Sequence, residues 1–155
     1  MTYNPRHTLP MPCYTLIDTS RGCDPAVVVV NTALRAYEHR GLYPWHLFIL
    51  ITCELLADKG MPTAQEVKAL EHLEGELSEH LLTNDNAILL ARVTCRGMRE
   101  LSFRVRDPKV ADAHLKNLVS AANPLRQWEY RMERDPDWAL AESELALIER
   151  TPGIN

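Results

Sequence analysis

Between residues 45 and 132 the spacing of hydrophobic residues changes several times between that of a strand and that of a helix. The resulting order of strands and helices restricts the fold more than any other feature of the sequence. Trp45–Leu55 is apolar at nearly every position, as expected of a strand that is covered on both faces. From Thr63 onward, apolar residues recur at steps of three and four, which predicts a helix. Two alternating runs, Ile88–Cys95 and Glu100–Arg106, are joined by a short glycine-containing link and predict a β-hairpin.

A second helix and a final strand complete this pattern. Asp107 and Pro108 are the residues expected at the N-cap and the first position of a helix. Trp128, Tyr130 and Met132 then alternate with polar residues, as in a strand. The resulting order is that of the ferredoxin-like split βαβ unit. We therefore predict an α+β fold with a ferredoxin-like βαββαβ core at about residues 45–132, in which both helices cover one face of a four-stranded antiparallel sheet.

The segments on either side of this core give weaker signals. Residues 1–12 hold three prolines and predict an extended arm. Within residues 13–40 we expect two N-terminal strands and a helix at 31–39, with Gly41 placed to end it. Residues 133–155 read as a short C-terminal helical segment. Residues 1–155 are thus expected to form a single domain, and the N-terminal strands either lengthen the core sheet or cover its second face.

Composition excludes several classes of protein. A chain of 155 residues with 46% hydrophobic and 25% charged residues has the composition of an ordinary globular domain. Its formal net charge of −4 argues against general nucleic-acid binding, which usually needs a basic excess. No secretory signal begins the sequence, and its most apolar stretch, residues 42–57, is too short and too polar to span a membrane. These features favour a cytoplasmic protein.

Several short motifs carry a resemblance to a known family. They are K-G-M-P at 59–62, L-E-x-L-E-x-E-L at 70–77, T-x-x-G at 94–97, R-E-L-S-F at 99–103 and D-P-D-W at 135–138. Together they resemble the bacterial domain-of-unknown-function family 695 over about residues 26–140. The sequence departs from the pattern at Arg104, where an aromatic residue often follows the phenylalanine. The resemblance implies a compact cytosolic α+β domain without established catalytic residues, distantly similar to protein regulators of ribonuclease E activity.

The D-P-D-W motif permits two interpretations. Asp135 and Asp137 are spaced so that both could hold a metal ion, provided that a histidine or further oxygen ligands lie nearby. Alternatively, Asp135 caps a turn, Pro136 fixes the backbone and Trp138 anchors the corner to the core. We favour the turn because the same D-P dipeptide also begins the helix at residue 107.

Other chemical signatures are weak or missing. His72, Glu76 and His80 share one face of the first predicted helix, but the H-E-x-x-H signature of zinc proteases is missing, so we expect an exposed polar face. His46 is expected to be a structural histidine of the central strand. The sequence has no G-x-S-x-G, P-loop or G-x-G-x-x-G motif. The cysteines form no C-x-x-C pair and predict free thiols; they are Cys13, Cys23, Cys53 and Cys95. We predict neither a cofactor nor a metal.

Charged residues give the only candidate surfaces. Four arginines are expected on strand faces opposite the inward apolar residues, namely Arg92, Arg104, Arg106 and Arg131. Because the strand aromatics point inward, the sheet lacks the stacking surface of an RNA-binding domain. A solvated face with cross-strand Arg–Glu pairs and a protein-binding face remain equally open. The first helix carries an acidic series that suits a basic partner, namely Glu66, Glu71, Glu74, Glu76 and Glu79.

These observations favour a cytoplasmic, non-catalytic protein-binding domain. Its partner would be another protein such as a toxin or a nuclease, so the chain would act as an immunity-type inhibitor or as a regulator of that enzyme. The alternative is an unrecognised hydrolase or metal-dependent enzyme that uses Asp135, Asp137 and a histidine. A small-ligand-binding domain is a third class. The sequence predicts no direct binding to nucleic acid or membrane, and it leaves a homodimer open.

Overall fold

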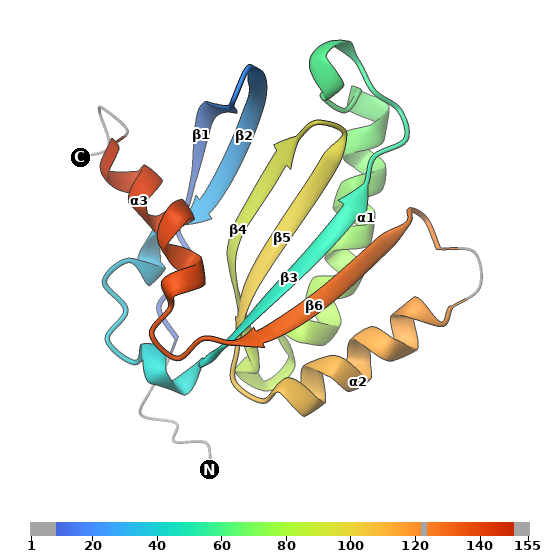
Figure 1. The fold of residues 1–155 in the computed structure, drawn as a ribbon. Helices are drawn as coiled ribbons and strands as arrows, with labels where there is room; N and C mark the ends of the chain where they lie inside the picture. Colours follow the sequence, from blue (N-terminus) through green and yellow to red (C-terminus); the bar gives the residue numbers. More distant parts are fainter. Residues whose placement is uncertain (1–8, 122–123, 151–155) are drawn as a thin grey trace.

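The computed structural model describes residues 9–121 and 124–150. Its centre is a six-stranded antiparallel sheet in the order β1-β2-β4-β5-β3-β6 (Figure 1). The strands are β1 (Tyr14–Arg21), β2 (Asp24–Asn31), β3 (Trp45–Thr52), β4 (Ala87–Cys95), β5 (Met98–Val105) and β6 (Trp128–Arg134). The helices are α1 (Ala64–Leu81), α2 (Pro108–Val119) and α3 (Glu142–Arg150).

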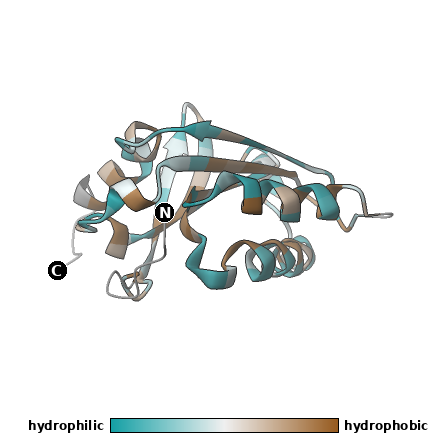
Figure 2. Cartoon of the chain, turned by 90° about the horizontal axis from the view of Figure 1, so that it is seen from below, coloured by the Kyte–Doolittle hydropathy of each residue, from teal (hydrophilic) through white to brown (hydrophobic). Residues whose placement is uncertain are grey.

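The predicted α+β class is confirmed, and so is the order of its central elements. The segment from β3 to β6 runs β3-α1-β4-β5-α2-β6, and its strands lie side by side in the order β4-β5-β3-β6. This is the arrangement of a ferredoxin-like core. Helices α1 and α2 lie on the same side of the sheet (Figures 1 and 2). The layer between them and the sheet is therefore the first hydrophobic core.

Local sequence signals fix where these helices begin. The Thr63 side chain accepts a hydrogen bond from the Glu66 N–H at 3.1 Å, and Asp107 caps α2 by accepting from the Lys109 N–H at 3.0 Å. The apolar stripe of α1 is buried against the sheet through Leu70, Leu73, Leu77 and Leu81. The sheet meets it with Leu47, Ile49, Ile51, Leu101 and Phe103, all fully buried. Trp128, Tyr130 and Met132 pack on the same core, as their alternation predicts.

The N-terminal hairpin lengthens the sheet beyond β4 instead of covering its second face. That face is covered over β2 and β4 by α3 and by the segment between β2 and β3 (Figure 1). The result is a second hydrophobic core, which includes Val28, Val30, Leu90, Val93, Tyr43, Trp138 and Leu145. The covering layer reaches the start of β3, where His46 is buried, but it leaves the rest of β3 and β6 uncovered. We call the uncovered surface there the open face; it consists of Phe48, Leu50, Glu129, Arg131 and Glu133.

Two local predictions are wrong. The helix expected at 31–39 is not formed, because β2 continues to Asn31 and short 3-10 turns follow at Thr32–Leu34 and Arg40–Leu42. Asn31 itself favours this path, since its buried side chain accepts hydrogen bonds from the N–H groups of Cys13 and Ala33.

The second correction concerns β4. The alternating run Ile88–Cys95 predicts that Leu89 and Ala91 share one face of the sheet. A β-bulge between them changes the alternation, so Leu89 packs in the first core and Ala91 in the second. Arg92 consequently points to the α1 side of the sheet. Within the described ranges, no helix is both long and apolar enough to cross a membrane.

Candidate functional site

The D-P-D-W motif forms the corner at which the chain leaves β6. The Asp135 N–H donates to the carbonyl oxygen of Pro44 at 2.7 Å, which joins the corner to the start of β3. The Asp135 carboxylate accepts from the N–H groups of Ala139 at 3.0 Å and Leu140 at 2.9 Å. Asp137 is exposed and forms no hydrogen bond with any residue that the structure describes. These contacts are those of a capped turn.

Arg104 of β5 extends into this corner and is fully buried. Its Nη1 donates to Asp135 Oδ2 at 2.9 Å and lies 3.1 Å from His46 Nδ1. Its Nη2 donates to the carbonyl oxygen of Tyr43 at 3.2 Å. Burial lowers the pKa of Arg104. Burial also raises the pKa of Asp135, but hydrogen bonds from the Leu140 N–H and from Arg104 outweigh it, so the net pKa is below its ordinary value.

Trp138 closes the corner, as its position in the motif predicts. Its side chain is 1% exposed, and the Arg104 guanidinium lies over its ring at 4.6 Å from the centroid. The indole N–H donates to the carbonyl oxygens of Arg40 at 3.0 Å and Tyr43 at 3.1 Å. Asp135 and Trp138 are therefore occupied by contacts that hold the fold together.

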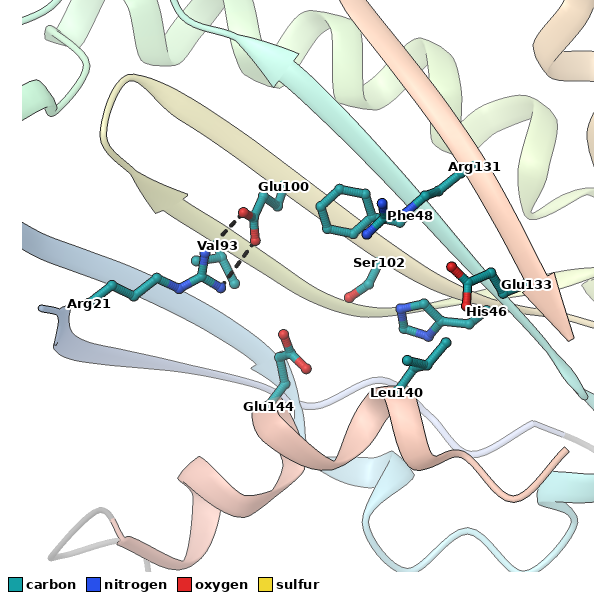
Figure 3. A pocket seen from close by; sticks show the side chains of 10 residues that line it. All are labelled: Arg21, His46, Phe48, Val93, Glu100, Ser102, Arg131, Glu133, Leu140 and Glu144. Atoms are coloured by element: carbon teal, nitrogen blue, oxygen red, sulfur yellow. Dashed lines mark hydrogen bonds and ion pairs between the residues drawn. The ribbon is translucent and has the colours of Figure 1, made fainter. Parts of the chain in front are cut away.

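A separate pocket of about 320 Å³ lies beside this corner, on the second face of the sheet (Figure 3). Strands β3, β5 and β6 form its floor, and α3 with the preceding turn supplies one wall (Figure 3). Its lining is a mixture of charged, polar and apolar side chains: Arg21, His46, Phe48, Val93, Glu100, Ser102, Arg131, Glu133, Leu140 and Glu144. This pocket is the candidate functional site.

His46 is one of the two buried polar residues of the pocket, at 8% exposure; the other is Ser102, at 7%. Because the Arg104 guanidinium is a donor, His46 Nδ1 must be the acceptor, which places the imidazole proton on Nε2. Burial and then the Arg104 charge lower the pKa of His46 from 6.5 to about 4. Among the described residues, none forms a hydrogen bond with His46 Nε2. The pocket thus contains an N–H donor that has no partner within the described chain.

Ser102 lies near His46 in the pocket but is not activated by it. Its hydroxyl donates to the carbonyl oxygen of Ala91 at 3.4 Å. A serine nucleophile needs a histidine base that is itself oriented by an acceptor such as a carboxylate. Here the group that orients His46 is a cation, Arg104, and the lowered pKa makes the imidazole a poor base at neutral pH. The two side chains therefore do not form a nucleophile–base pair.

The pocket holds charges of both signs at separate places. Arg21 and Glu100 form a two-point ion pair at 2.9 and 3.1 Å, which Figure 3 marks with dashed lines. The Arg131 guanidinium lies 4.9 Å from the centroid of the Phe48 ring and has no carboxylate partner among the described residues. On the α3 wall, burial raises the pKa of Glu144.

Two of the predicted partner-binding residues are in the interior. Glu66 is fully buried, and its carboxylate accepts from the Arg126 side chain at 2.6 and 2.8 Å and from the backbone N–H groups of Glu54 and Leu55. The Arg126 hydrogen bonds lower the pKa of Glu66 from 4.5 to about 2, against the opposing effect of burial. Like Arg104, Glu66 cannot face a partner, and both are removed from the candidate surface.

The remaining predicted residues do not form one surface. Arg92 donates to Glu74 of α1, so these two neutralise each other on the helix side of the sheet. Arg106 donates to the carbonyl oxygen of Asn84 at 3.1 Å. Glu71, Glu76 and Glu79 are exposed on α1, whereas Arg131 is exposed on the open face, on the other side of the sheet.

The histidines of α1 do not converge with other ligands. His72 Nε2 lies 3.3 Å from Glu76, and the His80 ring is 5.6 Å from the His114 ring, centroid to centroid. In the part of the chain that the structure describes, no three His, Cys, Asp or Glu side chains are grouped as a metal site requires. All four cysteines are free thiols, and Cys53 and Cys95 are buried.

Sequence reasoning did not identify the pocket. Alternation along β3 and β5 places His46, Phe48, Glu100 and Ser102 on one face, and this signal could have suggested a polar patch. Arg21 and Glu144 come from the ends of distant elements, so only the packing of β1 and α3 brings them there.

The comparison with known families agrees with the motifs. The profile of a family described as "Family of unknown function (DUF695)" matches residues 20–142. The chain belongs to this family. The DUF695 description assigns no activity, and no curated protein matches the sequence. Any function must therefore be argued from the site itself.

Proposed function

We propose that this DUF695 member is a non-catalytic domain that binds another protein through the open face of its sheet. The observation that carries the proposal is the uncovered part of the second sheet face, over β3 and β6. Phe48 and Leu50 are half-buried there, and the charged residues of β6 flank them. An apolar centre with a charged rim is the usual composition of a protein interface.

Arg131 supports a partner that brings an acidic group. It is exposed, has no carboxylate partner among the described residues and stacks on Phe48. Arginine is enriched in protein interfaces because its planar group binds carboxylates at two points and also stacks on aromatic rings. The exposed acidic residues of α1 offer a second surface on the other side of the molecule, which suits a basic partner.

Within this proposal the chain acts in the cytoplasm on a partner enzyme. It is either an immunity-type inhibitor of a toxin or a regulator of an enzyme such as a nuclease. The hydrolase alternative has lost its main support, because the oxygens of Asp135 already accept hydrogen bonds from Arg104 and two backbone N–H groups.

Site-specific crosslinking in the native host cell tests this proposal. A photo-crosslinking amino acid replaces Leu50 on the open face in one strain and Glu76 on α1 in another. We expect a discrete crosslinked protein from position 50, identified by mass spectrometry and lost with Arg131→Glu. The matched control is Arg134→Glu, which changes an exposed arginine of the same strand.

Each other outcome has a defined meaning. A crosslinked product from position 76 alone, with none from position 50, places the interface on the acidic face of α1. A product that contains two copies of this chain indicates a homodimer. If neither position yields a product in cells, the protein-binding proposal is wrong.

A further inference from the structure

The pocket beside the corner has the features of a small-ligand site, and it shares Phe48, Arg131 and Glu133 with the open face. Its volume of about 320 Å³ is at the lower end of the range for ligand pockets, about 300–1,000 Å³. Its floor contains His46, a buried residue whose Nε2–H has no hydrogen-bond partner in the described chain. A ligand oxygen can accept a hydrogen bond from this group.

On the β3 and β6 side of the pocket, His46 and Arg131 are donors, and Glu133, the register partner of His46, adds a carboxylate. His46 presents Nε2–H because its other ring nitrogen accepts from Arg104, and this arrangement holds as long as the ring is neutral. Arg131 approaches from the neighbouring strand, where its guanidinium is positioned over Phe48. Both groups can donate to a carboxylate, and Arg131 can bind one at two points.

The opposite wall supplies an acceptor. Glu144 projects into the pocket from α3, on the other side from His46 (Figure 3). Arg21, the nearest cation, is already bound at two points by Glu100. Glu144 is therefore a partly desolvated carboxylate without an ion-pair partner among the described residues, and an ammonium group would supply one.

The summed charge of the lining decides between an anion and a zwitterion. At neutral pH His46 is uncharged. The two arginines of the lining, Arg21 and Arg131, are then outnumbered by three glutamates, so the lining carries one excess negative charge; the glutamates are Glu100, Glu133 and Glu144. This excess repels a simple anion, although donors are available for it at one end. A ligand with no net charge and two separated charged groups matches both ends.

We propose that the pocket binds a small zwitterion of the amino-acid class, whose carboxylate accepts from His46 Nε2–H and Arg131 and whose ammonium group pairs with Glu144. The site shares Arg131 and Phe48 with the open face, but its test needs only the isolated chain and a small molecule, so the two proposals can fail separately.

Calorimetric titration of the full chain tests this site with simple probes. The zwitterions are glycine, γ-aminobutyrate and ε-aminocaproate, which differ in the separation of their two charges. Butyrate and butylamine carry the same groups singly. We expect at least one zwitterion to bind about tenfold more tightly than either single-charge probe, which corresponds to about 1.4 kcal/mol. Equal binding of butyrate, or no zwitterion binding at about 10 mM, overturns the proposal.

Variants assign the two ends of the ligand. Arg131→Gln and Glu144→Gln should each weaken zwitterion binding by about tenfold, and Glu144→Gln should leave butyrate binding unchanged or stronger. His46→Asn removes the Nε2–H donor but can retain an acceptor for Arg104. Glu76→Gln on α1 is the matched control outside the pocket and should bind like the wild type. Thermal unfolding of each variant confirms that it is folded, and wild-type affinity in a folded Glu144→Gln protein contradicts the proposed ammonium site.

Discussion

Arg104 and Asp135 form an ion pair at 2.9 Å inside the protein, with side chains that are 0% and 10% exposed. The pair joins the middle of the sheet to the corner that follows β6. Because Arg104 also donates to the carbonyl oxygen of Tyr43, it holds together three segments that are far apart in the sequence. The corner is therefore a structural centre of the fold, and its residues are poor candidates for chemistry.

The first prediction concerns this pair. Asp135→Ala leaves the guanidinium of Arg104 buried without its carboxylate, and it also removes the cap on the N–H groups of Ala139 and Leu140. Breaking a buried ion pair on one side typically costs about 3–5 kcal/mol. We expect a loss of that size in the free energy of unfolding, measured with urea.

Two further variants isolate the contribution of the pair. Asp137→Ala, at an exposed position of the same corner, should change stability by no more than about 0.5 kcal/mol. The double variant Arg104→Met with Asp135→Ala should cost less than the sum of the single changes, because no unpaired charge remains. Additive losses would show that the two side chains contribute independently.

The order of the strands and helices was predictable, whereas the role of Arg104 was not. Period changes along the chain identify elements, and alternation identifies which side chains share a face. Alternation correctly places Phe103 inward and Arg104 on the second face. It does not reveal that Trp138 and Asp135, thirty residues later, cover that face and bury the arginine.

The same limit explains the other differences. A bulge in β4 changes the side on which Arg92 lies, and no residue type in Ala87–Cys95 marks its position. Glu66 fits the capping pattern of α1, but its carboxylate binds Arg126, which comes from the loop before β6. Long-range ion pairs of this kind depend on how elements pack, and single-sequence patterns contain no information about that.

A pair of glycines provides the second prediction. Gly60 has φ of +76°, and a Cβ there would lie 3.1 Å from the backbone Cα of Arg96. Gly60→Ala should therefore destabilise the protein, with about 1–2 kcal/mol from the left-handed backbone alone. Gly75 lies in α1 with open space around it, so Gly75→Ala should stabilise by about 1 kcal/mol. Opposite shifts in the urea midpoint are expected, and equal shifts would contradict the backbone argument.

The third prediction concerns acid stability. The pKa of Glu66 falls from 4.5 to about 2 on folding, so its ionised form stabilises the native state. This contribution is present above pH 4.5 and is lost as the pH falls toward about 2; a change of this size corresponds to about 3 kcal/mol. Glu66→Gln should reduce stability at neutral pH and flatten its pH dependence in this window. Glu71→Gln, at an exposed position of the same helix, should retain the wild-type profile.

The last prediction concerns His46, whose pKa falls from 6.5 to about 4 in the folded protein. Between these values the unfolded chain binds a proton that the native state excludes, so stability decreases as the pH is lowered from 6.5 to about 4. The change corresponds to about 3 kcal/mol. His46→Asn should abolish this dependence, whereas His72→Asn on the exposed face of α1 should not change it.

Nitrogen NMR of the imidazole tests the same residue directly. At pH 7 we expect His46 to be neutral, with Nδ1 unprotonated and Nε2 protonated, because the Arg104 guanidinium is a donor to Nδ1 at 3.1 Å. The opposite tautomer would place two donors against each other and would remove the N–H group from the pocket. Such a result would contradict both the stability argument and the proposed carboxylate end of the ligand site. The expected tautomer instead supports an N–H donor that faces the pocket at neutral pH.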